Sequence, residues 1–290
     1  MLLRRGHIVS ILFFCLLFSG CSFQKIAVNA TASLINYNLL SFYEEEDPEI
    51  AKLAGASNLK ILEGLIKADP ENDTLLIKAS QGFGGYAFLF VEDDDPKRAE
   101  ALYRRGSEYG LAVLQKKDGF RKGLKGSIEE FKKSLLEFSR EDTPALFWTT
   151  YCWGAKINMN RNSPQALIEV PRVKLLMDRV LELDESYFYG GPHLLLGTYY
   201  ASKPKMLGGD PEKAKEHFEK AIRLGQNKFL MGQVMYARFY AVQVQDKELF
   251  KQLMDEVLKA GPDILPQQRL SNQVAKIKAE KSLKEIDQVF

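Results

Sequence analysis

Apolar residues recur at intervals of three and four along most of the chain, a spacing that places side chains on one face of a helix. In DPKRAEALYRRGSEYG, residues 95–110, one such face holds Ala99, Tyr103 and Gly106. Strand-type alternation is nearly absent, so the sequence predicts an all-α fold. The pattern predicts helices over residues 28–42, 48–68, 73–90, 96–115, 127–139, 144–159, 168–183, 187–202, 211–224, 228–243, 247–259 and 266–286.

The same helix opening occurs a second time, as DPEKAKEHFEKAIRLG at residues 210–225. In both copies an aspartate can cap the helix, and a proline fits its first position, where a missing N–H costs nothing. A shift of 115 residues aligns 58–111 with 173–226 without a gap, and the identical residues fall at turns, caps and small-residue packing positions. We interpret the two segments as a diverged internal repeat.

The second copy resembles the tetratricopeptide repeat (TPR), in which small residues let two helices approach closely and an aromatic ring fills the space beside them. The matching residues are Leu196, Gly197, Tyr200, Ala214, Phe218 and Ala221. Ala214 comes five residues later than the standard spacing, which lengthens the turn between the helices. No Ser/Gly-rich linker divides the chain, so residues 28–290 are predicted to form one domain, an α-α superhelical array of irregular TPR-like helical hairpins.

The first residues have the pattern of a secretory signal. Arg4 and Arg5 precede an apolar run, residues 8–18, that is too short to span a membrane, for which about 20 residues are needed. The run ends in LLFSGC, which resembles a bacterial lipobox. We therefore predict a signal peptide over residues 1–20, lipid attachment at Cys21, a lipidated tether over residues 21–27, and anchoring on a membrane through the acyl chains.

The charge balance and the number of cysteines limit which partners the protein can bind and which covalent bonds it can form. Residues after position 20 carry 38 basic and 38 acidic side chains without a basic stripe, which gives no support for nucleic-acid binding. Once the signal is removed and Cys21 is lipidated, Cys152 is the remaining cysteine, so an intramolecular disulfide is excluded. Its aromatic flanks predict a small buried hydrophobic residue.

No stretch carries a recognisable catalytic or cofactor motif. GFGGY at residues 82–86 lacks the Gly-Lys-Ser/Thr ending of a phosphate loop, and we interpret its glycines as helix-packing or channel-lining residues. His193 and His217 have no metal-ligand spacing; His217 is predicted to be solvated, whereas His193 is either satisfied by the backbone at a helix start or faces a ligand. We expect no cofactor, no metal and no enzyme activity, with a helical envelope hydrolase as an alternative.

Two aromatic clusters contain the strongest candidates for a binding surface. One lies within FWTTYCWGAKIN, residues 147–158, and the other within YFYGGPHLLLGTYY, residues 187–200. Aromatic side chains dominate burial energetics, so many of these rings belong to the core. The tyrosines also carry a polar end, and a repeat array presents concave surfaces to partners and ligands.

Together these segments resemble the TatT family, TPR-containing lipoproteins associated with tripartite ATP-independent periplasmic (TRAP) transporters. The resemblance rests on the lipoprotein signal, RAEALYRRGSEYGLAVL at 98–114, the aromatic stretch at 147–158, RVLELDESYFYGGPHLLLGTYYA at 179–201 and LGGDPEKAKEHFEKAI at 207–222. It implies an all-helical homotrimer with a pore through each protomer. The candidate ligand, pore or partner positions are Trp148, Tyr151, Trp153, Gly154, Tyr187, Tyr189, Gly190, Gly191, His193 and Tyr199.

The resemblance also implies a function in ligand transport. The protein would face the periplasm from a membrane, preferably the outer one, bind a TRAP-type periplasmic solute-binding protein, and help transfer a small hydrophobic or organic-acid ligand. The alternative is a generic TPR adaptor lipoprotein in cell-envelope assembly, which predicts a fully open groove and no small-molecule ligand.

Overall fold

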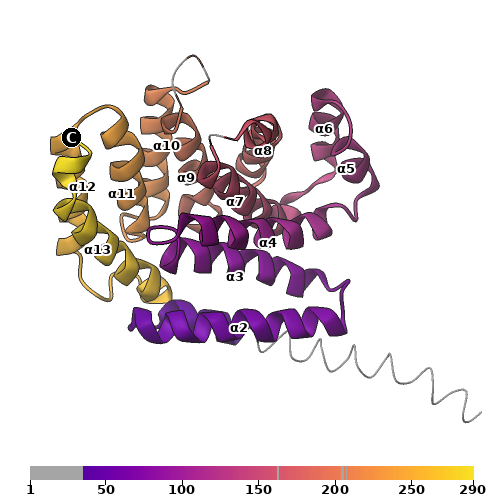
Figure 1. Cartoon of the computed structure of the whole chain (residues 1–290), viewed down its shortest axis with the longest axis horizontal. Coiled ribbons are helices and arrows are strands. Elements are labelled where there is room, and N and C mark those ends of the chain that lie inside the picture. Colours follow the sequence, from indigo (N-terminus) through magenta and orange to yellow (C-terminus); the bar gives the residue numbers. More distant parts are fainter. Residues whose placement is uncertain (1–34, 162, 204–205, 207) are drawn as a thin grey trace, which may run out of the picture.

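The structure is a computed structural model that describes residues 35–161, 163–203, 206 and 208–290 (Figure 1). The predicted signal peptide, Cys21 and the tether over residues 21–27 lie outside the described residues. Within the described ranges the chain forms helices and turns and no strand, which confirms the all-α fold class.

In the part of the chain that the structure describes, twelve α-helices follow residues 35–44, which are also helical. They are α2 (Pro48–Ala68), α3 (Asp73–Phe90), α4 (Pro96–Leu114), α5 (Asp118–Gly123), α6 (Ile128–Ser134), α7 (Thr143–Met159), α8 (Pro164–Leu183), α9 (Tyr187–Ala201), α10 (Pro211–Leu224), α11 (Met231–Met235), α12 (Lys247–Lys259) and α13 (Arg269–Lys284). A π-helix, Tyr236–Ala241, continues α11, and short 3-10 turns lie at Leu135–Glu137, Arg140–Asp142, Pro266–Gln268 and Ile286–Gln288.

Four parts of the chain differ between the prediction and the structure. Helix α5 was not predicted because six residues are too few to show a helical period, although Phe120 is fully buried. Helix α8 starts at Pro164, earlier than predicted, because Pro164 occupies the tolerated first position. The single helix predicted over residues 228–243 is instead α11 followed by the π-helix, and the one over 127–139 is α6 followed by a 3-10 turn.

The two copies of the repeat fold into packed helix pairs, α3 with α4 and α9 with α10. The carboxylates of Asp95 and Asp210 cap α4 and α10 as predicted, accepting from Arg98 N at 3.0 Å and Lys213 N at 3.2 Å. In the second pair Gly197 faces Phe218: a Cβ at Gly197 would lie 3.0 Å from the ring. Close helix contact therefore depends on the small residue beside the aromatic one.

Cys152 of α7 lies where three helices cross. A Cβ atom added at Gly84 of α3 or at Gly106 of α4 would meet its Sγ at 2.6 Å. The thiol is free and fully buried, donates to Ser80 O at 3.3 Å, and has its pKa raised by burial to about 12. Cys152 is thus the buried hydrophobic residue that the sequence predicts, and two glycines make room for it.

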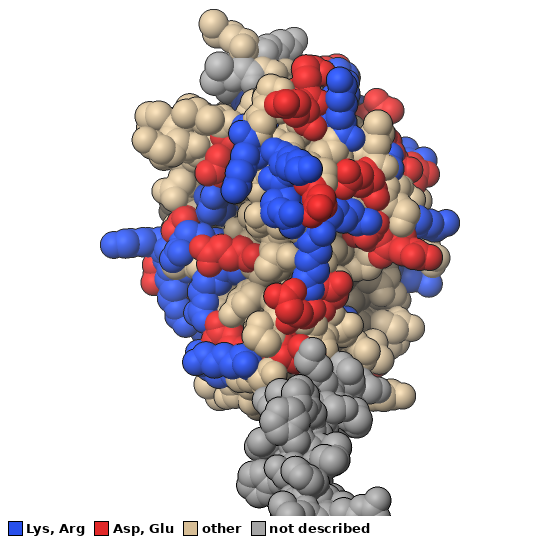
Figure 2. All heavy atoms as spheres, turned by 90° about the vertical axis from the view of Figure 1, so that its right-hand side faces the viewer, with Lys and Arg blue, Asp and Glu red and all other residues tan. Residues whose placement is uncertain are grey.

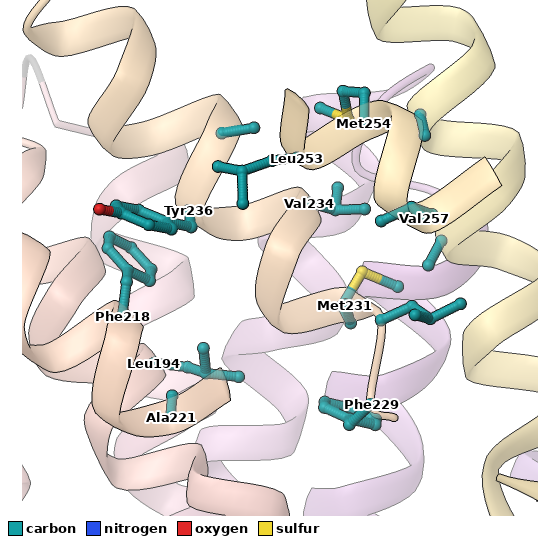
Figure 3. Packing of buried hydrophobic residues seen from close by; sticks show 14 of the residues in the cluster. Leu194, Phe218, Ala221, Phe229, Met231, Val234, Tyr236, Leu253, Met254 and Val257 are labelled. Atoms are coloured by element: carbon teal, nitrogen blue, oxygen red, sulfur yellow. The ribbon is translucent and has the colours of Figure 1, made fainter. Parts of the chain in front are cut away.

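The helices follow an arc whose ends meet (Figure 1). One hydrophobic cluster lies among α2, α3 and α4, a second extends from α4 to α9, and a third extends from α9 to α13 and includes Ala51 of α2. In this third cluster Phe218, Tyr236 and Val257 come from α10, the π-helix and α12 (Figure 3). Helix α13 packs against α2, and Arg269 Nη1 donates to Glu44 O at 3.0 Å, so the last helix contacts the first ones.

The surface carries both signs of charge. On the face that corresponds to the right-hand side of Figure 1, basic and acidic side chains are interspersed (Figure 2). No helix among the described residues has the length and apolarity that a membrane crossing requires.

The helix crossing at Cys152 gives a test of packing. We expect Gly106→Ala to lower the free energy of unfolding by about 1–3 kcal/mol, because the new methyl group overlaps Sγ. Adding Cys152→Ala should recover part of this loss. Gly64→Ala, where nothing lies within 4 Å, should instead stabilise the protein by about 0.5–1 kcal/mol. Urea unfolding of these three variants and the unaltered protein measures these differences; equal effects of Gly106→Ala and Gly64→Ala would contradict the packing model.

Candidate functional site

Three adjoining cavities occupy the middle of the helical arc. The first, here called the aromatic cavity, has a volume of about 70 Å³ and is lined by residues that include Tyr43, Phe88, Trp148, Tyr151 and Phe188. Leu194, Phe229 and Met231, which are labelled in Figure 3, also line it. The second, the central cavity, has a volume of about 290 Å³ and shares Phe88, Tyr151, Leu195 and Met235 with the first.

The third, here called the mouth cavity, is the largest and the most polar. Its volume is about 760 Å³, and it shares Glu92, Asn158, Met159, Arg161, Ser202 and Phe239 with the central cavity. The series of cavities therefore changes from charged at the mouth to apolar and aromatic at the far end. Apolar cavities with a few placed polar groups are the usual form of a small-molecule site.

Five of the candidate residues from the sequence lie at these cavities. Trp148, Tyr151 and Gly191 line the aromatic cavity, and Tyr151, Gly154 and Tyr199 line the central cavity. They come from α7 and α9, so the two aromatic stretches that the sequence singled out meet in space. That these residues contact a ligand stays a prediction.

The remaining candidates line none of the three cavities. Trp153 is buried in the second cluster, where its indole N–H donates to Glu169 and Lys156 lies above its ring. Tyr187 packs its ring against Phe147 with 5.1 Å between ring centroids. Helix α7 is apolar on nearly every face, so its sequence could not tell which aromatic ring faces a cavity and which faces a neighbouring helix.

The start of α9 contains an unusual backbone. Phe188, Tyr189 and Gly190 have φ values of 47°, 59° and 78°, in the left-handed region that costs a non-glycine residue roughly 1–2 kcal/mol. Gly190 is required, because a Cβ there would also lie 3.0 Å from Ala221 Cα of α10. This bend directs Phe188 toward Trp148 at the aromatic cavity, 4.9 Å between centroids, and stacks Tyr189 on Phe229.

Two histidines pair beside this bend, and together they connect α9 to α10. His193 Nδ1 lies 2.8 Å from His217 Nδ1, and His193 Nε2 lies 3.3 Å from a Glu185 carboxylate oxygen. With both rings neutral, His193 donates from Nε2 to Glu185 and accepts at Nδ1 from His217. The structure matches neither possibility for His193 in full: its partners are the side chains of His217 and Glu185 rather than the backbone, and it lines none of the three cavities. The prediction that His217 is solvated was wrong, because it is half-buried against His193 and stacks on Tyr200.

Both imidazoles are held in their neutral form. Burial is the main cause that lowers the pKa of His193, although Glu185 opposes it. Burial, together with the repulsion from His193, lowers the pKa of His217 to about 4. Lys174, Asp178, Glu216 and Lys220 are the other charged groups that act on this pair.

A group of buried charges, here called the clasp, forms one wall of the mouth cavity. Asp93, after α3, accepts from Arg238 of the π-helix at 2.7 Å and from Lys278 of α13 at 2.6 Å. Lys278 is only 5% exposed and lies 3.7 Å from Glu92, which also accepts from Tyr103 at 2.6 Å. The clasp therefore joins the first third of the chain to the last.

The pKa values of the two carboxylates in the clasp are shifted in opposite directions. Burial by itself would raise the pKa of Asp93, but Arg238 and Lys278 lower it to about 2. Burial raises the pKa of Glu92, against the opposing effect of Lys278.

Sequence reasoning missed several residues at these cavities, among them Phe88, Arg161, Lys203 and Met235. Phe88 and Met235 lie in ordinary apolar runs, which carry no signal of their own. Arg238 could have been found, because a charged residue inside YARFYA is a polar group in an otherwise aromatic segment. Within the ranges that the structure describes, no group of three His, Cys, Asp or Glu side chains is arranged to hold a metal ion.

Two comparisons place the chain among known proteins. A family model described as TRAP transporter T-component matches residues 44–290, which include every helix from α2 to α13. A curated relative from Treponema pallidum (strain Nichols), described as an uncharacterized protein, is 24% identical over 287 residues, and the match covers 88% of each chain.

The clasp should be a major source of stability. We expect Asp93→Asn to lower the free energy of unfolding by about 3 kcal/mol, because it leaves the charge of Lys278 buried with a weaker partner. Asp94→Asn, which removes the exposed pair with Lys281, is the matched control and should cost less than about 1 kcal/mol. Chemical denaturation compares the two; similar small losses would refute a structural role for the clasp.

The histidine pair predicts acid sensitivity. Both histidines have a lower pKa in the folded protein than in the unfolded chain, so the unfolded chain binds protons first as the pH falls. The stabilisation from the neutral pair is therefore complete above about pH 6.5 and decreases as the pH drops toward 4. His217→Phe keeps a ring against Tyr200 and should flatten the dependence of unfolding free energy on pH in this range. If the unfolding free energy of His217→Phe depends on pH as strongly as that of the unaltered protein, the histidine pair is not the cause of the acid sensitivity.

Proposed function

The chain belongs to the TRAP transporter T-component family, and we propose that it serves such a transporter as a non-enzymatic, ligand-carrying component in the bacterial periplasm. In this role lipid on Cys21 holds the protein on a membrane, the outer membrane in our proposal. The protein binds the TRAP-type solute-binding protein and helps transfer a small hydrophobic or organic-acid ligand.

The observation that carries this proposal is the series of adjoining cavities within a chain of this family. Shared lining residues connect the polar mouth cavity to the apolar cavities. This arrangement suits a small molecule that enters the protein better than it suits a partner protein that binds on the surface. In an open solenoid each repeat contacts only its neighbours. Here α13 packs against α2, which favours an enclosed cavity over the open groove of a generic TPR adaptor.

The finer parts of the proposal are a TPR-like arrangement and a homotrimer. The packed pairs α3/α4 and α9/α10, with Gly197 facing Phe218, support TPR-like hairpins. Large apolar side chains exposed on residues 35–44 and on α2 offer a surface for contact between copies; they are Tyr37, Leu40, Ile50, Leu53 and Ile61. Exposed apolar patches of this kind are typical of protein contact sites.

A cross-linked pull-down from native envelopes tests the partner. Tagged full-length protein should recover a TRAP-type periplasmic solute-binding protein, identified by mass spectrometry. Cys21→Ala removes the lipid site and should shift the protein from the membrane fraction to the soluble periplasmic fraction. Because no described contact of the folded domain is altered, the variant should still bind a purified solute-binding protein.

Two outcomes would count against the proposal. Recovery of outer-membrane assembly proteins without a solute-binding protein would support the adaptor function instead. Membrane attachment that is unchanged in Cys21→Ala would contradict the lipid anchor.

A further inference from the structure

The central cavity is built for an apolar body. Most of its lining is apolar, including Val170, Val173, Met177, Leu195 and Phe239. An apolar cavity of about 150 Å³ binds benzene. At about 290 Å³, the central cavity has room for a group about twice that size, on the order of ten non-hydrogen atoms.

The charges at the mouth do not balance. The central and mouth cavities together are lined by two acidic side chains, Glu92 and Asp93, and by four basic ones, Arg161, Lys203, Arg238 and Lys278. Arg238 and Lys278 pair with the acids in the clasp. Arg161 and Lys203 form no ion pair with any described residue, which leaves two positive charges facing the cavities.

Lys203 is also poorly solvated. Its ammonium lies 3.7 Å from the centroid of the Tyr199 ring, and burial, followed by the repulsion from Lys174, lowers its pKa to about 8. A neighbouring anion would relieve both effects, because an opposite charge favours the charged form of a lysine.

Two buried polar atoms at these cavities have no hydrogen-bond partner among the described residues. Thr198 Oγ1 is buried at the central cavity and makes no hydrogen bond with the described residues. At the mouth, Gln243 donates to Lys203 O at 3.3 Å, while its own Oε1 is buried with no donor in the described chain. A buried polar group that is left unsatisfied costs roughly 1–3 kcal/mol, so such groups commonly mark a place that a ligand or water fills.

We propose that Arg161, Lys203 and Thr198 form a subsite for the anionic head of an amphiphilic ligand whose apolar body occupies the central cavity. This inference names the ligand class of the proposed transport function and therefore rests on it. The head carries one negative charge near two cations, and the body has roughly eight to twelve non-hydrogen atoms, set by the cavity volume.

The same geometry selects against other ligand classes. A sugar acid would bring many hydroxyl groups into the central cavity, where the lining is mainly apolar and would leave them without partners. A dicarboxylate would place its second charge in the apolar part of this cavity, beside Val173, Met177 and Leu195, where burial of an unpaired charge is costly. A neutral alkyl chain would fill the cavity but leave the two cations unpaired.

Calorimetric titration of the mature, unlipidated chain with decanoate, below its micelle-forming concentration, tests the inference. Decanoate should bind at least tenfold more tightly than either decanol, which lacks the charge, or acetate, which lacks the body. Decyl phosphate is the second anionic probe: tighter binding than decanoate would indicate a phosphate head, as in a lipid fragment, and weaker binding a free carboxylic acid.

Substitutions locate the subsite. Lys203→Gln and Arg161→Gln should each weaken decanoate binding about tenfold and leave decanol binding unchanged. Lys251→Gln removes the same charge from the exposed face of α12 and is the matched control. Arg161 lies on an exposed turn after α7, so its variant tests the subsite without disturbing the core.

The inference would be overturned by equal affinity for decanol and decanoate, or by an equal loss of decanoate affinity in Lys203→Gln, Arg161→Gln and Lys251→Gln. A pull-down with Lys203→Gln, scored for recovery of the solute-binding protein, separates the proposed ligand class from the proposed transport function. If decanoate fails to bind while the solute-binding protein is still recovered, only the ligand class is wrong; if decanoate binds but no solute-binding protein is recovered, the transport function is wrong.

Discussion

The contact between Asp93 and the two cations Arg238 and Lys278 is the constraint on which the rest of the structure depends. It joins residues that are 145 and 185 positions apart in the chain and closes the helical arc. Burying charges costs desolvation energy, which is offset here by short hydrogen bonds and by several partners around one carboxylate. Because hydrophobic contact has little directional preference, this polar contact also fixes how the last helices meet the first, and so fixes the shape of the cavities between them.

Packing of small residues supports the same enclosure from within. Gly84 and Gly106 let α3 and α4 approach Cys152, and Gly190 lets the start of α9 approach α10. Close contacts of this kind make the scaffold rigid, since little volume is left for rearrangement. Phe188 and Tyr189 are among five described non-glycine residues with a left-handed backbone, and of these two, Phe188 directs its aromatic ring to a cavity. Strained backbone persists only where its surroundings hold it, and commonly does so near functional sites.

A closed arc accounts for features that an open repeat array leaves unexplained. Open solenoids bind partners on an exposed concave surface. Here the inner surface is divided into an aromatic end, an apolar middle and a charged mouth, so polarity changes along a path rather than across a face. The chain belongs to the TRAP transporter T-component family, and the proposed transport of a ligand would use this path.

The sequence by itself determined the helices and much of the local packing. Asp-Pro pairs start α2, α4 and α10, and helix-period spacing marked Tyr103 and Phe218 as buried, because capping and amphipathic spacing depend on neighbours within a few turns. The aromatic stretches of α7 and α9 were singled out from the sequence as two separate clusters, and the structure brings them together. Only the tertiary structure decided that Trp148 faces a cavity while Trp153 faces Glu169, that His193 pairs with His217, and that Asp93 meets Lys278. These contacts depend on how distant helices pack, and residues so far apart leave no periodic trace in one sequence.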